Sequence, residues 1–433
     1  MAKLTIHHPF GISSRKTIET IRLCLYEMNR VEKIGITMLS ELISDETFRD
    51  LPKSAPQLHT LRIGLSSFKT GFSIHEDFLY DAERLQHVDL INCKISWDSR
   101  LLTGLTRLRL EVEDSSKLNS SMNQFLHALQ RMPALTELRL KDSIPDDSEG
   151  HSTYPDIDLS CLRVLDISSG VGALTVVLHH IAIPHSAILK LTCKEKQSTQ
   201  IDFSDFLSVL ATKFLSSLVF RSLALQLLDC RLKFFLWTTE TFTSFLIPLP
   251  QTQLELVLKW PSPQPHNYVK ALTCAFEAMS LPFLTKLYIS TFDYVDRAHF
   301  IDSQTWVKTF GTLPLLEWVH VHHEDCGIEW FLEALVYKTE PAEKSETAYY
   351  RNVSFPKLRH IYIETRHLYA TSVDRLLDCL MERRERNAGV QGLCLHSWYS
   401  ISPNDVERLK EIVVDVSVIK GPYTGNRLGA GSL

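Results

Sequence analysis

The sequence predicts an α/β protein in which a strand, a loop and a helix are repeated many times. Three observations lead to this prediction. A strand phrase with the pattern apolar-x-x-apolar-x-apolar recurs along the 433 residues, segments with helical spacing lie between successive phrases, and the first phrases follow one another at about 20 to 30 residues. Together they are typical of a leucine-rich-repeat solenoid, with a curved parallel sheet on the concave face and helices on the convex face.

The strand phrases recur from one end of the chain to the other. Their first apolar residues are Leu58, Leu85, Leu105, Leu135, Leu162, Ile188, Leu284, Leu316, Leu358 and Val390. The second phrase is the most complete, because Leu85, Val88, Leu90 and Cys93 fill the L-x-x-L-x-L-x-x-N/C pattern. We therefore expect Cys93 to be buried, with its thiol acting as a weak donor beneath the strand.

Helical spacing between the phrases is clearest at 122–132 and 373–380. Pro133 and Gly389 follow these two segments, and both residue types commonly lie just beyond a helix. The most apolar stretch, 203–237, contains charged residues throughout, so we expect packed helices there and no membrane span.

Weaker strands are expected at 254–258 and 413–418, and the second of these would cap the array. The chain is accordingly divided into an N-terminal cap or linker region (1–53), an irregular leucine-rich-repeat array (54–420) and a flexible tail (421–433). An insertion at 338–353 leaves the register of the later repeats open.

Composition describes a globular protein, with 44% hydrophobic residues, 22% charged residues and a formal net charge of −5. Such a charge disfavours a nucleic-acid partner. The nine cysteines occur singly, without metal-binding or disulfide spacing, which favours reduced thiols. The first residues lack the apolar core of a secretory signal. We expect a monomer in the cytoplasm, the nucleus or both, with no cofactor and no membrane contact.

Three stretches of the chain are similar to one family. They are MNRVEKIGI leading to SAPQLHTLRIG (28–36 and 54–64), CKISWDSRLLTGLTRLRLEV with Trp97 (93–112), and NQFLHALQRMPALTELRLKDSIP (123–145). The order of these stretches resembles the F-box/leucine-rich-repeat proteins of mushroom-forming fungi. The resemblance implies a substrate-binding array of a cullin-RING ubiquitin ligase, whose adaptor would dock on an N-terminal F-box. This sequence shows no F-box motif, so no F-box residue is assigned.

The repeat register predicts which side chains face a partner. Side chains alternate across a strand, so the variable residues between the apolar positions face the concave surface. The candidate partner-binding residues are Arg107, Arg109, Glu137, Arg139 and Lys141 in the N-terminal half, and Tyr288, Trp318, His320, His360 and Tyr362 in the C-terminal half. Arg109 beside Arg139 would place like charges together, which hints at a bound anion. The alternative is a solvated face in which Arg107 simply pairs with Glu137.

A weaker candidate is a metal site. His322, Glu364 and His396 share one column of the register, and two histidines with a carboxylate could ligate zinc. A solvated histidine cluster is the default interpretation. Motifs of nucleotide-binding, metalloprotease and hydrolase sites are absent from the sequence, so we expect no enzyme. The sequence thus leaves three functions open: a ubiquitin-ligase substrate receptor, a repeat scaffold unconnected to ubiquitin, and, less favoured, a metal-dependent enzyme.

Overall fold

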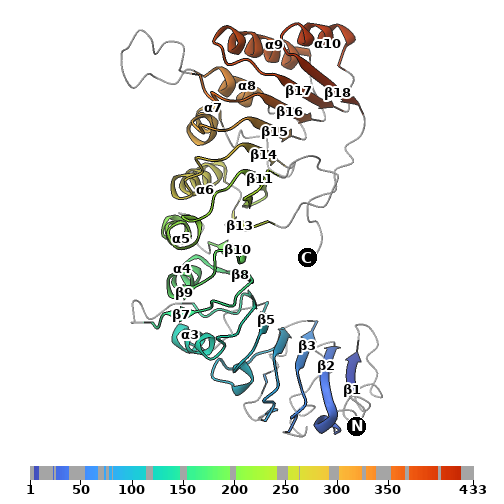
Figure 1. The fold of residues 1–433 in the computed structure, drawn as a ribbon, viewed down its shortest axis with the longest axis vertical. Helices are drawn as coiled ribbons and strands as arrows, with labels where there is room; N and C mark the ends of the chain where they lie inside the picture. The colour runs from blue at the N-terminus through green and yellow to red at the C-terminus, as the bar shows by residue number, and fades with distance from the viewer. Residues whose placement is uncertain are drawn as a thin grey trace. The chain divides into compact units, whose positions relative to one another are not determined.

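The computed structural model describes residues 4–8, 23, 26–38, 54–66, 73–74, 78–79, 81–113, 120–146, 154–195, 201–240, 252–262, 264–291, 302–323, 328–337, 353–365, 370–397 and 401–420. The chain divides into two compact units, Met1–Lys194 and Glu195–Leu433. In each unit the strands form a mostly parallel sheet and the helices lie along one side of it (Figure 1). The predicted α/β class with a large, mostly parallel sheet is therefore confirmed.

The strands of the first unit lie side by side in sequence order, and each described pair is parallel. They are β1 (Leu4–His8), β2 (Val31–Met38), β3 (Thr60–Leu65), β4 (His87–Ile91), β5 (Arg107–Glu111), β6 (Glu137–Lys141), β8 (Val164–Gly170) and β10 (Ile188–Lys194). Two short strands, β7 (Ile157–Asp158) and β9 (Ile181–Ala182), form a separate parallel pair. Because β1 and β2 precede residue 54, part of the expected cap region continues the sheet.

An apolar ladder holds the strands of the first unit in register. Leu61, Val88, Leu108, Leu138 and Leu165 lie opposite one another on five consecutive strands, and none is more than 2% exposed. A slip of one residue would turn these side chains to the other face of the sheet, so their burial fixes the register.

A repeated turn follows the strands β4 and β6. Asn92 and Asp142 both have positive φ angles, 56° and 52°, and the next residue donates a hydrogen bond to a carbonyl of the neighbouring strand. The Cys93 thiol lies 3.8 Å from the Ile63 carbonyl oxygen, and the Ser143 hydroxyl lies 3.2 Å from that of Leu110. Cys93 is 3% exposed, so its expected burial is confirmed.

The first unit contains the helices α3 (Met122–Gln130) and α4 (Val171–His180). Helix α3 confirms the helix expected at 122–132. It begins with a capping box, in which the side chains of Ser121 and Gln124 satisfy each other's backbone N–H groups. Its buried Phe125 packs edge-on against Trp97, with 4.8 Å between ring centroids. Trp97 is therefore a core residue.

The second unit begins its sheet with an antiparallel segment. The strands, in spatial order, are β13 (Leu254–Lys259), β12 (Arg231–Trp237), β11 (Ser222–Leu228), β14 (Lys286–Thr291), β15 (Trp318–His323), β16 (His360–Thr365), β17 (Gly392–Ser397) and β18 (Asp415–Lys420). Strand β12 is antiparallel to both of its neighbours. The remaining pairs, from β11 to β18, are parallel.

The expectation of packed helices throughout 203–237 is wrong for its second half. Helix α5 (Ser204–Leu210) and a π-helical turn (Ala211–Leu215) occupy the first part, but β11 and β12 form a hairpin in the second. All but the last residue of β11 are buried. A strand buried on both faces has no period of two, so its sequence is easily taken for a buried helix.

The other helices of the second unit are α6 (Pro265–Ala278), α7 (Ser303–Trp306), α8 (Glu329–Val336), α9 (Ala370–Glu385) and α10 (Pro403–Lys410). Helix α9 contains Arg383, which is fully buried. Its guanidinium donates hydrogen bonds to the carbonyls of Leu335, Ser354 and Phe355 at 2.8 to 2.9 Å. Arg383 thus joins α9 to the end of α8 and to the segment before β16.

Every phrase of the sequence analysis becomes a strand, and the weaker strands expected at 254–258 and 413–418 correspond to β13 and β18. The expected flexible tail at 421–433 lies outside the described residues, as does the insertion at 338–353 except for its last residue. Within the described part of the chain, no helix has the length and apolar character needed to cross a membrane.

The ladder makes a direct prediction about stability. Replacing Leu138, which is fully buried, by alanine should lower the free energy of unfolding by about 2 to 5 kcal/mol, because a core cavity remains. Replacing the exposed Lys141 on the same strand by alanine should change it by less than about 0.5 kcal/mol. Chemical denaturation measures both, and similar losses in the two variants would contradict the placement of the ladder.

Candidate functional site

The register of β3 to β6 brings charged side chains together on the side of the sheet opposite the apolar ladder. Arg62 lies opposite Asp89, Asp89 opposite Arg109, and Arg109 opposite Arg139. In the adjoining row, two residues earlier along each strand, Arg107 lies opposite Glu137. We call these six residues the arginine face. Neighbouring strands are about 4.8 Å apart, so each side chain lies within reach of the next one along the row.

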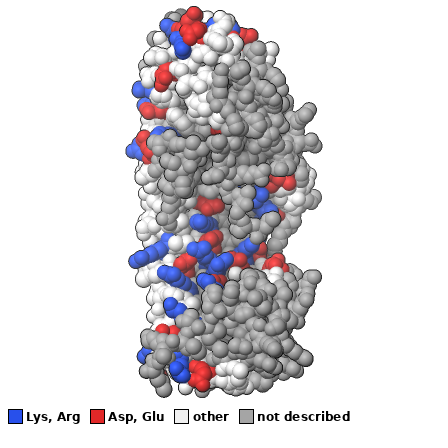
Figure 2. Space-filling view, turned by 90° about the vertical axis from the view of Figure 1, so that its right-hand side faces the viewer, with Lys and Arg blue, Asp and Glu red and all other residues white. Residues whose placement is uncertain are grey.

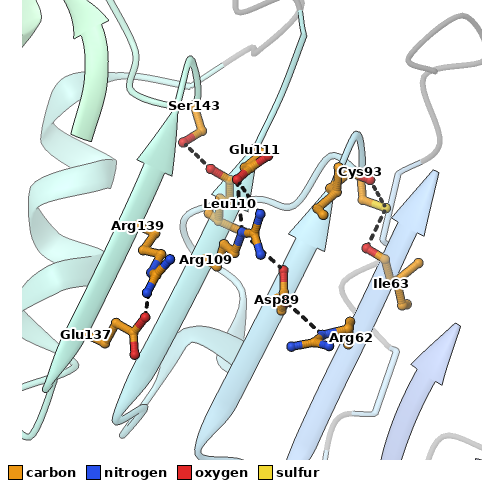
Figure 3. Close-up of polar contacts among 11 residues, drawn as sticks. Arg62, Ile63, Asp89, Cys93, Arg109, Leu110, Glu111, Glu137, Arg139 and Ser143 are labelled. Carbon is orange, nitrogen blue, oxygen red and sulfur yellow. Dashed lines mark hydrogen bonds and ion pairs between the residues drawn. The ribbon is translucent and has the colours of Figure 1, made fainter. Parts of the chain in front are cut away.

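Two carboxylates are each shared by two arginines. Figure 3 shows Asp89 between Arg62 and Arg109, and Glu137 beside Arg139. Asp89 lies 2.8 Å from Arg62 Nε and 3.8 Å from Arg109 Nε. Glu137 lies 2.5 Å from Arg139 Nε and 3.8 Å from Arg107 Nε. The arginines are 39% to 60% exposed and the two acids only 13% and 25% exposed. The acids therefore lie beneath the guanidinium groups and hold them in place.

Glu111 supplies a further contact to Arg109. One of its carboxylate oxygens accepts hydrogen bonds from Arg109 Nε at 2.9 Å and from Arg109 Nη2 at 2.7 Å. Burial disfavours the charged form of Arg109, but the hydrogen bond and charge of Glu111, together with Asp89, outweigh burial and raise its pKa. The repulsion expected between Arg109 and Arg139 is thus offset by the protein's own acids, and it does not by itself require a bound anion.

The arginine face lines a cavity of about 290 Å³. Its lining residues are Thr60, Arg62, His87, Val88, Asp89, Arg107, Leu108, Arg109, Glu137 and Arg139. The lining contains four arginines and two carboxylates, so it carries an excess of positive charge. Burial, followed by the charge of Arg107, lowers the pKa of His87, so this side chain adds no charge at neutral pH. Figure 2 shows basic and acidic side chains intermixed on the side of the molecule that faces the viewer.

The structure places the N-terminal candidates as the register predicts, with one correction. Arg107, Arg109, Glu137 and Arg139 line the cavity, whereas Lys141 lies opposite Glu111 and outside the lining. The sequence argument did not select Arg62 and Asp89, although both occupy the same register column as Arg109 and Arg139.

The register of β10 differs from the expected one by two residues. With Ile188 as the first apolar residue of its phrase, Thr192 would lie opposite Asp166, but the structure places Lys190 there. The phrase of β10 begins with Ser186 instead of an apolar residue, since Leu189 and Leu191 pair with Leu165 and Ile167. Ile188 lies two residues after Ser186, and the sequence analysis mistook it for the first apolar residue of the phrase.

In the second unit the C-terminal candidates share the expected rows, even beyond the insertion. Trp318 lies opposite His360, and His320 lies between Tyr288 and Tyr362. The expectation that all of them are exposed is wrong, because Tyr288 is 3% exposed and His320 is fully buried. Trp318 and Tyr362 are half-buried, and His360 is exposed.

Aromatic packing explains this burial. Tyr288 packs with Ala224 and Trp237 of the hairpin formed by β11 and β12. The ring of His320 lies 4.7 Å from that of Tyr288 and 4.0 Å from that of Tyr362, measured between centroids. The antiparallel hairpin, which the sequence analysis missed, thus turns this part of the sheet face into a core.

The residues of the weak metal candidate do meet. Glu364 lies 3.2 Å from His320 Nε2, 3.4 Å from His322 Nδ1 and 3.1 Å from His396 Nδ1. Three imidazoles therefore surround one carboxylate. Within the part of the chain that the structure describes, no group of three or more His, Cys, Asp or Glu side chains has an arrangement that could hold a metal ion. The cluster is an arrangement of close contacts between histidine nitrogens and one carboxylate that joins strands β15, β16 and β17.

Burial and hydrogen bonding set the charges in this cluster. Burial lowers the pKa of His320 to about 4, against the opposing effect of Glu364. Burial alone would raise the pKa of Glu364, but the hydrogen bonds and charges of His320 and His322 lower it to about 2. At neutral pH the cluster therefore holds a neutral His320 beside an ionised Glu364.

The cluster predicts a stability that falls with acid. His320 titrates near 6.5 in the unfolded chain and near 4 in the folded one, so between these values the unfolded state binds more protons. The free energy of unfolding should fall by about 3 kcal/mol over this window, and Glu364 should add a further loss below about pH 4.5. Chemical denaturation at several pH values measures this slope.

Replacing His320 by glutamine should flatten the slope between pH 6.5 and about 4, because the titrating group is removed. Replacing the exposed His360 by glutamine should leave it unchanged. Equal slopes for the wild-type protein and the His320→Gln variant would contradict the assignment.

We compared the chain with known proteins. A scan against protein-family models and a search of curated proteins both found no match.

Proposed function

We propose that the chain is a protein-recognition module built as a leucine-rich-repeat solenoid, and that its first unit binds a protein partner through the arginine face. The parallel strands with one register, the apolar ladder and the turn repeated at Asn92 and Asp142 support this fold. In such arrays each repeat buries its apolar side against its neighbours, which leaves the opposite side chains to vary with the partner.

One observation carries the functional proposal. Four arginines, each anchored at Nε by a carboxylate, extend over a cavity in the sheet face with a surplus of positive charge. Arginine is enriched at the residues that dominate protein interfaces, and anchored side chains lose less entropy on binding. The arginine face has both properties, as expected of a surface that is preorganised to bind a protein.

The resemblance to fungal F-box proteins supports a more specific version, in which the module selects substrates for a cullin-RING ubiquitin ligase. The alternative is a scaffold that binds its partner without any link to ubiquitin. Both versions use the same surface, and they differ in whether a ligase adaptor accompanies the partner. A metal-dependent enzyme has no observation in its favour among the described residues.

The proposal predicts that two exposed arginines are needed for the partner and not for the fold. The double variant Arg107→Gln/Arg139→Gln should reduce recovery of the partner by roughly tenfold or more, while its thermal midpoint stays within about 3 °C, since exposed ion pairs contribute little stability. Affinity purification of tagged protein under proteasome inhibition, with quantitative mass spectrometry, measures recovery.

The matched control is Arg100→Gln/Arg163→Gln, which removes the same charge from exposed positions of the same unit. It should retain the partner. Equal recovery with the site variant and the control would contradict the proposal. A ligase adaptor and cullin that co-purify with the partner would support the ubiquitin version, and a partner recovered without them would support the scaffold.

A further inference from the structure

We infer that Arg109 and Arg139 form a slot for one side-chain carboxylate, supplied by an acidic segment of the protein partner. The inference rests on the proposed function and specifies the chemistry of the partner at that surface. It follows from the order of charges along one row of the sheet.

The row runs through the centre of the arginine face and continues onto the next two strands. In spatial order its members are Arg62, Asp89, Arg109, Arg139, Asp166 and Lys190. Positive and negative charges alternate at every step of this row except one. At the step from Arg109 to Arg139 two cations are neighbours with no carboxylate between them.

The protein itself shows which group fits between two such cations. In the same row Asp89 lies between Arg62 and Arg109, and it approaches the Nε atoms of both. In the adjoining row Glu137 is shared by Arg107 and Arg139. A side-chain carboxylate is therefore the group that already joins neighbouring arginines on these strands. A carboxylate from outside would complete the one step that lacks it.

Donors remain for such a ligand. Arg139 uses Nε toward Glu137, and Arg109 uses Nε and Nη2 toward Glu111. Among the described residues, both terminal amino groups of Arg139 and the Nη1 group of Arg109 have no hydrogen-bond partner. The two side chains are 44% and 39% exposed, so a ligand can reach them. A carboxylate that accepts from two guanidinium groups makes charge-assisted hydrogen bonds, which are the stronger kind.

The surrounding acids argue against a polyanion. Asp89, Glu111, Glu137 and Asp166 flank the slot on both sides, so a chain of closely spaced phosphates would meet repulsion at each step. The whole chain also carries a net charge of −5. A protein segment with separated acidic side chains suits this surface better than a nucleic acid does.

Binding of a defined peptide tests the slot. The probe is a fluorescein-labelled peptide that alternates Glu and Ser, and fluorescence anisotropy at low salt measures its affinity. We expect it to bind at least roughly tenfold more tightly than the corresponding Gln and Ser peptide. The Arg139→Gln variant should weaken this binding by roughly fivefold or more, because it removes the free amino groups.

Arg62→Gln is the matched control, since it removes the same charge from the same row at a position where Asp89 already occupies the neighbouring step. It should weaken binding less than about twofold. Equal losses in the two variants would show a diffuse charge effect and overturn the slot. Tighter binding of a single-stranded oligonucleotide would overturn the choice of a protein partner.

The slot and the proposed function can fail separately. If the cellular partner depends on Arg107 and Arg139 but the wild-type protein does not prefer the Glu peptide over the Gln peptide, the recognition surface stands and the carboxylate slot is wrong. If the Glu peptide binds through Arg139 but no cellular partner depends on these arginines, the slot stands and the proposed recognition function is wrong.

Discussion

The in-register apolar ladder is the constraint on which the rest of the first unit depends. Leu61, Val88, Leu108, Leu138 and Leu165 are almost completely buried on consecutive parallel strands. Because strand side chains alternate, fixing these residues inward also fixes the residues between them outward and in rows. The arginine face is thus a consequence of core packing. Variation at the outward positions changes the surface without changing the fold, as repeat architectures permit.

The arginine face combines strong positive charge with local neutralisation. Each shared carboxylate lies deeper than the arginines it joins, with Asp89 only 13% exposed. Exposed ion pairs of this kind add little stability, generally below about 1 kcal/mol each. Their larger effect is to hold the guanidinium groups in one orientation before a partner arrives, which reduces the entropy lost on binding. The equivalent positions of the second unit differ in exposure, because His320 and Tyr288 are buried in a core.

Sequence alone predicted the strand of every phrase, the helices at 122–132 and 373–380, and most of the register. The repeated phrase is easiest to recognise where one face of a strand is buried and the other is solvated. It failed at β10, where Ser186 replaces the leading apolar residue, and at the hairpin of β11 and β12, where burial of β11 on both faces removes the alternation from that strand. It also failed for the exposure of Tyr288, which packs against the hairpin, and of His320, whose ring contacts those of Tyr288 and Tyr362. The shared carboxylates Asp89 and Glu137 could be placed in rows from the sequence, but their distances to the arginines could not.

The most direct test of this account is whether Arg109 and Arg139 are true neighbours in the sheet. Paired cysteines at these positions should lie about 5 Å apart and react with both ends of dibromobimane, a short thiol cross-linker that fluoresces after double reaction. A pair at positions 109 and 141, one diagonal step away at about 7 to 8 Å, should react poorly. Single-cysteine variants report the background of native thiols. Strong cross-linking at 109 and 139 alone is the predicted result, and equal or stronger cross-linking at 109 and 141 would contradict the register from which the arginine face is built.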